Sequence, residues 1–435
     1  MLLQEIAFHP DEARATLEAL PVVPAVFALY GAEAKDEPYV GRTPNLRARL
    51  ERLLVPSAKH PRRLQLAGRV RRIAWLATGS EFESLLAQFS LLVEVFGGER
   101  ALKRMHLGAP TFVRFMGSNR YPRVSLTTRP GAREAGWFYG PFASRDRAER
   151  FVDETLKLFL LRRCTEELEP DPKHPGCVYS EMKKCLAPCF GGCTDERYAE
   201  ESQAVEQFLS TRGESQLVPL RAAREAASED LEFERAAALH EQVQRVEAVR
   251  ALAPELVQPL DRLRAVVLQA SATPGEVAVF LFDQGRLRGP VGFSTFGMRI
   301  QNEQSGSTSL FVHPVAIVPV PEEKGPRGEE PGTRDQGLLG SGDEGLETNV
   351  LRTEKKIARD VLVERLEAVL AALTSAEAAT AVERQGHLAL LKRWYYRPEA
   401  RRVGEIFFLN EDGQWPEKAI LRGIGRVAAR AFATA

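Results

Sequence analysis

Residues 164–193 read CTEELEPDPKHPGCVYSEMKKCLAPCFGGC and contain all five cysteines of the 435-residue chain. Cysteines that only fill a core would be scattered along the sequence, and disulfide frameworks belong to small secreted domains. Thiols gathered in one short segment of a large chain instead predict soft ligands for a metal ion or an iron–sulfur centre. Free core thiols are the alternative interpretation.

The rest of the composition is that of a large globular protein. Hydrophobic residues make up 44% and charged residues 27% of the chain, which is long enough to form several cores. The first residues, MLLQEIAFHPDEARATLEAL, carry acids early and lack the basic and apolar regions of a signal peptide. No apolar run approaches the length of a membrane span. We therefore expect a cytoplasmic protein whose thiols stay reduced.

The formal net charge is zero, but basic residues concentrate in one segment. Between Arg42 and Arg72 there are nine arginines and Lys59, against the single acid Glu51. This local excess predicts a phosphate-binding face, with a solvated basic surface as the alternative. The candidate DNA-binding residues in this segment are Arg47, Arg52, Arg62 and Arg63.

Hydrophobic periodicity predicts an α+β chain of several domains. Aromatic and β-branched residues predict short strands at 24–30 and 37–41, and helical periodicity follows in NLRARLERLL and SEFESLLAQFSLLVEVFG. Residues 321–348 are rich in Gly, Pro and Glu and contain no aromatic side chain, so we expect them to form a disordered linker.

Two triplets and a helix stand out near the N-terminus. Ala25-Val26-Phe27 and Tyr39-Val40-Gly41 lie on the paired strands, and an R-x6-R pattern then runs into the helix. This layout resembles a GIY-YIG nuclease domain. The resemblance implies that Tyr39 belongs to a tyrosine pair near the attacking water, in which Phe27 takes the place of the other tyrosine, and that Gly41 ends the second triplet. It also implies that Arg42 is a neighbouring basic residue and that Arg49 holds the scissile phosphate.

The same block departs from the family pattern where a catalytic metal should bind. Family members carry a glutamate on the following helix, and alignment places Gln88 there. A neutral amide lacks the charge that holds Mg²⁺. Glu81, two turns earlier, and Glu83, which points about 140° away, do not obviously replace it. Phe27 also lacks the hydroxyl of the family tyrosine. An active Mg²⁺-dependent nuclease and a non-catalytic binding or regulatory relative therefore both stay open.

A second resemblance covers the stretch from Trp137 to Cys189. The run WFYGPFASRDRAERFVDETLKLFLLRRC is followed by PGCVYSEMKKCLAPC. These motifs resemble the segment after the nuclease domain of the UvrC family of bacterial excinuclease components. The resemblance implies that Cys164, Cys177, Cys185 and Cys189 hold an iron–sulfur cluster (4Fe-4S), and it leaves Cys193 outside the ligand set. Zinc is the rival, because four thiolates also satisfy tetrahedral Zn²⁺.

The segment LEFERAAALHEQVQRVEAV, which begins at Leu231, resembles the UVR motif of the same family. Small and apolar residues lie close together on this helix. The resemblance implies that they dock on a UvrB-like partner. An amphipathic helix packing on its own domain is the alternative. The residues concerned are Phe233, Ala236, Ala237 and Leu239.

Beyond residue 255 the resemblance weakens. ILRGIGRVAARAF, at 420–432, resembles the Gly-Ile-Gly turn of a helix-hairpin-helix, in which backbone N–H groups approach a phosphate. Trp394, Tyr395 and Tyr396 lie among basic residues and could stack on unpaired bases, although we expect helix packing to be their role.

Together the resemblances imply a UvrC-like protein of nucleotide excision repair that docks on a UvrB-like partner and, if active, incises damaged DNA. A cysteine-metal structural protein unrelated to DNA is a third interpretation. The expected units are a GIY-YIG nuclease-like domain (1–105), a linker with the four-cysteine region (106–195), a UVR helical hairpin (196–254), a β-rich strand block (255–320), the disordered linker (321–348) and a C-terminal helical or mixed module (349–435).

Overall fold

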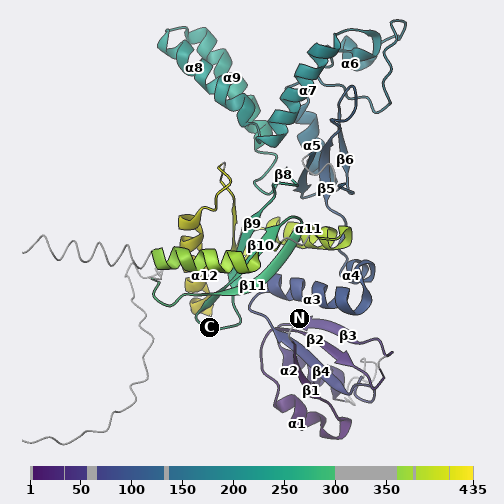
Figure 1. The fold of residues 1–435 in the computed structure, drawn as a ribbon, viewed down its shortest axis with the longest axis vertical. Helices are drawn as coiled ribbons and strands as arrows, with labels where there is room; N and C mark the ends of the chain where they lie inside the picture. Colours follow the sequence, from purple (N-terminus) through teal and green to yellow (C-terminus); the bar gives the residue numbers. More distant parts are fainter. Residues whose placement is uncertain are drawn as a thin grey trace, which may run out of the picture.

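The computed structural model describes residues 3–33, 35–55, 66–131, 137–298, 360–375, 379–410 and 412–434. Within them the chain is α+β and multidomain, with three four-stranded sheets and helices between them (Figure 1). The predicted fold class is confirmed at this level. The expected linker at 321–348 lies outside the described residues. None of the described helices has the length and apolar character needed to cross a membrane.

The N-terminal sheet has the strand order β1-β4-β2-β3, and its neighbouring strands are antiparallel. One face packs on α1 and α2, and the opposite face packs on α3. The side chain of Asn45 caps α2 by accepting a hydrogen bond from Ala48 N, and Ser80 caps α3 in the same way through Glu83 N. The bounds are β1 Gln4–Ala7, α1 Ala13–Glu18, β2 Ala25–Tyr30, β3 Tyr39–Thr43, α2 Leu46–Leu54, β4 Arg72–Ala77 and α3 Glu81–Phe96.

The middle sheet has the order β6-β5-β7-β8 and packs on helices α5, α7 and the base of α9. Its last strand, β8, comes from far along the chain and pairs Pro259 with Tyr139. The cysteine segment leaves this unit as a long excursion between α5 and α7 (Figure 1). The bounds are α4 Gly98–Arg104, β5 Thr111–Phe115, β6 Val124–Thr127, β7 Phe138–Phe142, α5 Arg145–Thr155, α6 Val178–Glu181, α7 Asp195–Ser210 and β8 Gln258–Pro259.

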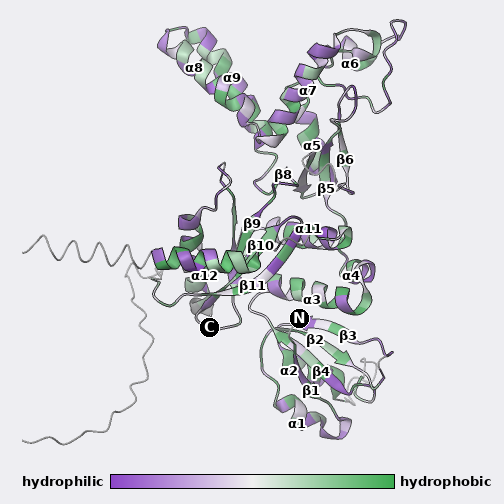
Figure 2. Ribbon diagram, in the orientation of Figure 1, coloured by the Kyte–Doolittle hydropathy of each residue, from purple (hydrophilic) through white to green (hydrophobic). Residues whose placement is uncertain are grey.

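Helices α8 (Glu214–Glu229) and α9 (Phe233–Arg250) form a hairpin that projects away from the sheets (Figure 1). Both helices carry mixed hydrophilic and hydrophobic residues along their length (Figure 2). The base of the hairpin enters the middle core, through Leu217 of α8 and through Val243, Val246 and Val249 of α9. The far end of the hairpin, near Phe233, is exposed.

The third sheet joins two segments that the sequence analysis treats as separate units. Its order is β11-β10-β9-β12, and β12 (Glu405–Phe408) pairs with β9 (Ala265–Ala270). The strand block after 255 and the C-terminal module thus share one sheet. A helix over 360–373 and α12 cover one face, and α11 covers the other. The remaining bounds are β10 Glu276–Asp283, β11 Arg286–Ser294, α11 Ala381–Tyr395 and α12 Glu417–Thr434.

Helix α3 lies between the N-terminal sheet and the third sheet with its helix α11 (Figure 1). Hydrophobic colouring runs along most of α3, as expected of a helix that packs on two sides (Figure 2). Gly386 lets α11 approach closely, because a Cβ there would lie 2.1 Å from the Phe89 ring. Gly79 does the same just before α3, where a Cβ would lie 2.2 Å from the backbone of Ser271. The two units are therefore in direct contact.

Candidate nucleic-acid interface and cysteine site

Four residues of the predicted site lie together where the N-terminal sheet packs on α2. Phe27, Tyr39 and Gly41 come from the sheet, and Arg49 comes from α2. Phe27 and Gly41 are opposite one another in the β2–β3 register, and the Phe27 ring lies 6.1 Å from the Tyr39 ring. Gly41 makes room for the Phe27 ring, since a Cβ at position 41 would lie 2.9 Å from it. The Arg49 guanidinium donates a hydrogen bond of 3.1 Å to the Tyr39 hydroxyl. The structure thus brings together four residues of the predicted site.

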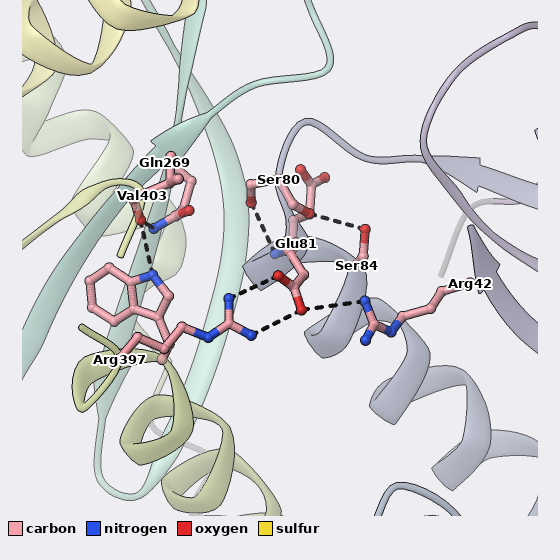
Figure 3. Close-up of polar contacts among 9 residues, drawn as sticks. Arg42, Ser80, Glu81, Ser84, Gln269, Arg397 and Val403 are labelled. Atoms are coloured by element: carbon pink, nitrogen blue, oxygen red, sulfur yellow. Dashed lines mark hydrogen bonds and ion pairs between the residues drawn. The ribbon is translucent and has the colours of Figure 1, made fainter. Parts of the chain in front are cut away.

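Arg42 points to the other face of the same sheet. It lies opposite Val26, whose side chain packs on α3. Its guanidinium is 3.6 Å from Glu81, and Arg397 donates two hydrogen bonds of 2.8 and 2.9 Å to the same carboxylate (Figure 3). Hydrogen bonding by Arg397 lowers the pKa of Glu81 below its usual value. Arg42 is therefore connected to the C-terminal module rather than to Tyr39.

The acids near Gln88 are already engaged in the protein. Gln88 is partly exposed on α3, on the same helical face as Glu81. Two guanidinium groups occupy Glu81, as described above. Glu83 is buried, accepts a hydrogen bond of 2.8 Å from Gly79 N, and has a pKa raised by desolvation. Neither carboxylate is therefore free to act as the metal ligand that the resemblance predicts at position 88, where this chain has glutamine.

Two of the four arginines predicted to bind DNA, Arg47 and Arg52, lie in the described residues, and their surroundings differ. Arg47 donates two hydrogen bonds, of 2.9 and 2.6 Å, to the Leu20 carbonyl and so holds the loop before β2. Arg52 is exposed on α2 and donates a hydrogen bond to the Ala48 carbonyl of its own helix. Arg62 and Arg63 lie outside the described residues. Within this set, Arg52 has a position suited to a phosphate.

Cys164, Cys177, Cys185 and Cys189 line one small pocket, and Cys193 is not among its lining residues. Among the hydrogen bonds that reach the sulfurs, Ala187 N donates to Cys185 at 3.3 Å and the Arg162 guanidinium donates to Cys164 at 3.5 Å. Burial raises the pKa of Cys185 to about 11. No group of three or more His, Cys, Asp or Glu side chains in the described segments has an arrangement that could hold a metal ion. The four sulfurs share a pocket without forming a ligand shell.

The partner-binding residues predicted on α9 lie near the exposed tip of the hairpin. Phe233 is 68% exposed, and Leu231 beside it is 70% exposed. Ala237 is exposed, whereas Ala236 and Leu239 are partly buried. Leu231 and Phe233 place two large apolar side chains close together at the tip of a projecting hairpin, and such a patch can serve as a docking site.

Two expectations for the C-terminal module can be compared with the structure. The prediction of a turn at Gly423-Ile424-Gly425 is wrong, because α12 continues through these residues without a break. That glycine instead allows α12 to pack on β12, since a Cβ would lie 2.5 Å from the Phe407 ring. The packing role of the aromatic run is confirmed: Trp394 is buried and donates to the Val403 carbonyl, and Tyr396 donates to the Pro141 carbonyl.

Sequence reasoning missed the role of Arg397 altogether. The residue follows the aromatic run that the sequence singled out, but its partner Glu81 lies 316 positions earlier. The sequence shows Arg397 as a basic residue beside aromatic residues, but it does not indicate that Glu81 is the carboxylate that Arg397 contacts.

Comparison with known proteins places part of this chain in a family. Residues 112–208 match the family described as UvrC/Cho excinuclease, middle domain; they run from β5 to α7 and include all five cysteines. UvrABC system protein C of Alcanivorax borkumensis is 33% identical over 228 residues, which is 52% of this chain and 37% of that protein. The proteins of the same name from a Ruegeria species and from Ruminiclostridium cellulolyticum are 31% and 28% identical, over 57% and 63% of this chain.

The chain spans less than half the length of these relatives, with 39% of the Ruegeria protein and 44% of the Ruminiclostridium protein covered. No solved structure matched it. The match on the middle unit agrees with the motifs from Trp137 to Cys189. Residues 112–208 therefore match a UvrC/Cho-type middle domain, and about half of the chain is similar to UvrABC system protein C.

Proposed function

We propose that this protein acts in nucleotide excision repair as a UvrC-like component that docks on a UvrB-like partner and brings its N-terminal domain to damaged DNA. The observation that carries the proposal is the UvrC/Cho middle-domain match at 112–208. The elements on either side of it are consistent with such a role. The hydrogen-bonded pair Tyr39 and Arg49 precedes it, and a hairpin with an exposed apolar tip follows it.

The Tyr39–Arg49 pair has the chemistry for holding a DNA phosphate. A guanidinium presents several donors to phosphate oxygens, and its hydrogen bond to the Tyr39 hydroxyl uses only one of them. Arg49 is only partly buried, so a backbone phosphate could reach it. In an active GIY-YIG-type domain, the same contact would stabilise charge that develops on the phosphate during incision, with Mg²⁺ supplying Lewis-acid chemistry.

The proposed docking on a UvrB-like partner predicts that Phe233→Asp weakens the binding of that partner. We expect the variant to lose at least tenfold in affinity for a UvrB-like protein, because a charge replaces an exposed apolar anchor. The binding constant can be measured by calorimetry, with thermal unfolding as a check on folding. Phe296→Asp is the matched control, since Phe296 is 72% exposed on a different unit. Equal affinities of the two variants would contradict docking through α9.

We also propose that Cys164, Cys177, Cys185 and Cys189 hold the cofactor, as an iron–sulfur cluster or as zinc. Support comes from the pocket that the four side chains share and from the N–H groups that donate hydrogen bonds to Cys164 and Cys185, because hydrogen bonds to the ligand atoms help to orient them in metal sites. A bound cluster would supply a rigid cross-link for the excursion between α5 and α7.

The cofactor proposal predicts different results at two cysteines. Anaerobically purified protein is expected to carry bound iron, with a broad visible absorption band, or colourless zinc. Cys185→Ser should lower the metal content to near zero, whereas Cys193→Ser should leave it unchanged, because Cys193 does not line the pocket. Elemental analysis and an absorption spectrum distinguish the two metals. A wild-type protein without metal, or equal loss in both variants, would overturn the assignment.

A second candidate function is a non-catalytic protein that binds DNA and partner without cutting. Gln88 supports it, together with the engagement of Glu81 by arginines and of Glu83 by the backbone. Both candidates use the same binding surfaces. They differ in whether the N-terminal domain can hold a divalent cation, and a substitution at Gln88 separates them.

A further inference from the structure

Two arginines from distant parts of the chain meet at one carboxylate, Glu81, and a third arginine lies close to one of them in the sequence. Arg42 comes from β3, Arg393 from the last turn of α11, and Arg397 from just after that helix. Arg397 holds Glu81 with two hydrogen bonds, and Arg42 lies 3.6 Å from it. Arg393 is exposed in the last turn of α11, four residues before Arg397. Figure 3 shows Arg42 and Arg397 approaching Glu81 from opposite sides.

The charges of this cluster do not cancel. Three guanidinium groups and one carboxylate leave an excess of two positive charges (three minus one). Glu83, two residues beyond Glu81, is buried and accepts a hydrogen bond from Gly79 N, so it is not exposed on this surface. A positively charged surface shared by two units is the kind of feature that attracts phosphates.

The arginines also retain hydrogen-bond donors. Arg397 uses one N–H from each terminal nitrogen on Glu81, which leaves three of its five. Arg42 is in ion-pair range of Glu81 without a hydrogen bond to it. Arg393 is exposed and makes no hydrogen bond or ion pair with the part of the chain that the structure describes. Glu81 therefore orients the cluster without using up its donors.

We propose that Arg42, Arg393 and Arg397 form one phosphate-binding surface for the DNA backbone, centred on Glu81 and shared by the N-terminal domain and the C-terminal module. The inference rests on the proposed function, since it assumes that the ligand is DNA. It adds the C-terminal module to the DNA-binding face. Glu81 acts here as a positioning residue: its two hydrogen bonds fix the plane of the Arg397 guanidinium, and its charge attracts Arg42.

We expect substitutions of the arginines and of Glu81 to change the affinity for DNA in opposite directions. Arg393→Gln and Arg397→Gln should each weaken binding of a short duplex and reduce the slope of log K against log salt concentration by about one, as expected for one lost phosphate contact. Glu81→Gln should strengthen binding, because it removes the negative charge. If Arg397 and Glu81 only held the two units together, both substitutions would weaken binding alike.

The measurement is fluorescence anisotropy of a labelled duplex over a series of KCl concentrations. Arg145→Gln is the matched control, because Arg145 is an exposed, ion-paired arginine on α5. Unchanged affinity and slope in both Arg393→Gln and Arg397→Gln, with weaker binding by Arg49→Gln, would overturn this surface and leave the proposed function standing. No salt-dependent binding by the wild-type protein would overturn both.

Discussion

A methyl group added at position 79 is expected to destabilise the protein by about 3 kcal/mol. The Cβ of Gly79→Ala would lie 2.2 Å from the carbonyl carbon of Ser271 and 2.4 Å from Ala272 N. Both atoms belong to backbone that leaves β9, so neither can rotate away as a side chain could. The N-terminal unit must then shift away from the third sheet, which disturbs the packing of α3.

Thermal unfolding provides the measurement, with the midpoint of Gly79→Ala expected to fall by roughly 5 °C or more. Gly68→Ala is a matched control, because a Cβ there meets nothing within 4 Å. The control should unfold within about one degree of the wild type. Equal midpoints for the two variants would show that the contact between Gly79 and the third sheet is not part of the stable fold.

The largest functional effect is expected from Gln88→Glu. A carboxylate at this position would restore a charged oxygen ligand for Mg²⁺, which binds poorly to a neutral amide. We expect Mg²⁺-dependent cleavage of a lesion-bearing duplex to rise on the order of a hundredfold, which corresponds to about 2.7 kcal/mol of transition-state stabilisation. The rate of product formation can be followed on a denaturing gel.

Two further variants make this test specific. Ser90→Glu adds the same charge to an exposed position about 200° around α3, and it should leave cleavage at the wild-type rate. Arg49→Ala added to Gln88→Glu should abolish the gain, because the phosphate loses its guanidinium. Wild-type cleavage as fast as that of Gln88→Glu would contradict the role assigned to position 88.

Local patterns gave good predictions for the N-terminal unit. The alternation in 24–30 predicts β2, and the leucine spacing after Asn45 predicts α2. In each case the decisive information lies within about ten residues, because side-chain periodicity and capping are local properties. The contact between Tyr39 and Arg49 also fits this description, since β3 runs almost directly into α2.

Long-range pairings could not be predicted in the same way. Strand β12 joins β9 across a gap of more than a hundred residues, and β8 returns to the middle sheet after the whole hairpin. Nothing in the four residues of β12 specifies its partner strand. For the same reason, the Gly-Ile-Gly sequence at 423–425 predicts a turn, whereas its first glycine in fact allows α12 to pack closely on β12.

The cysteines are an intermediate case. Their clustering predicts a metal site, and the resemblance implies four of the five as ligands; the structure places those four around one pocket, with Cys193 not among its lining residues. Spacing could not show which donors reach the sulfurs, because Arg162 and Ala187 are brought there by the fold of the excursion. The match at 112–208 supports the identity of the unit, and the chemistry of its cofactor stays a proposal.

The most direct test of the proposed function is assembly on damaged DNA. The protein should be mixed with a UvrB-like partner and a duplex that carries one bulky lesion, and the complexes separated on a native gel. The proposal predicts a slower complex that needs the lesion and the partner together, and that is lost in Phe233→Asp but not in Phe296→Asp. Equal binding to damaged and undamaged duplex, with no effect of the partner, would contradict it.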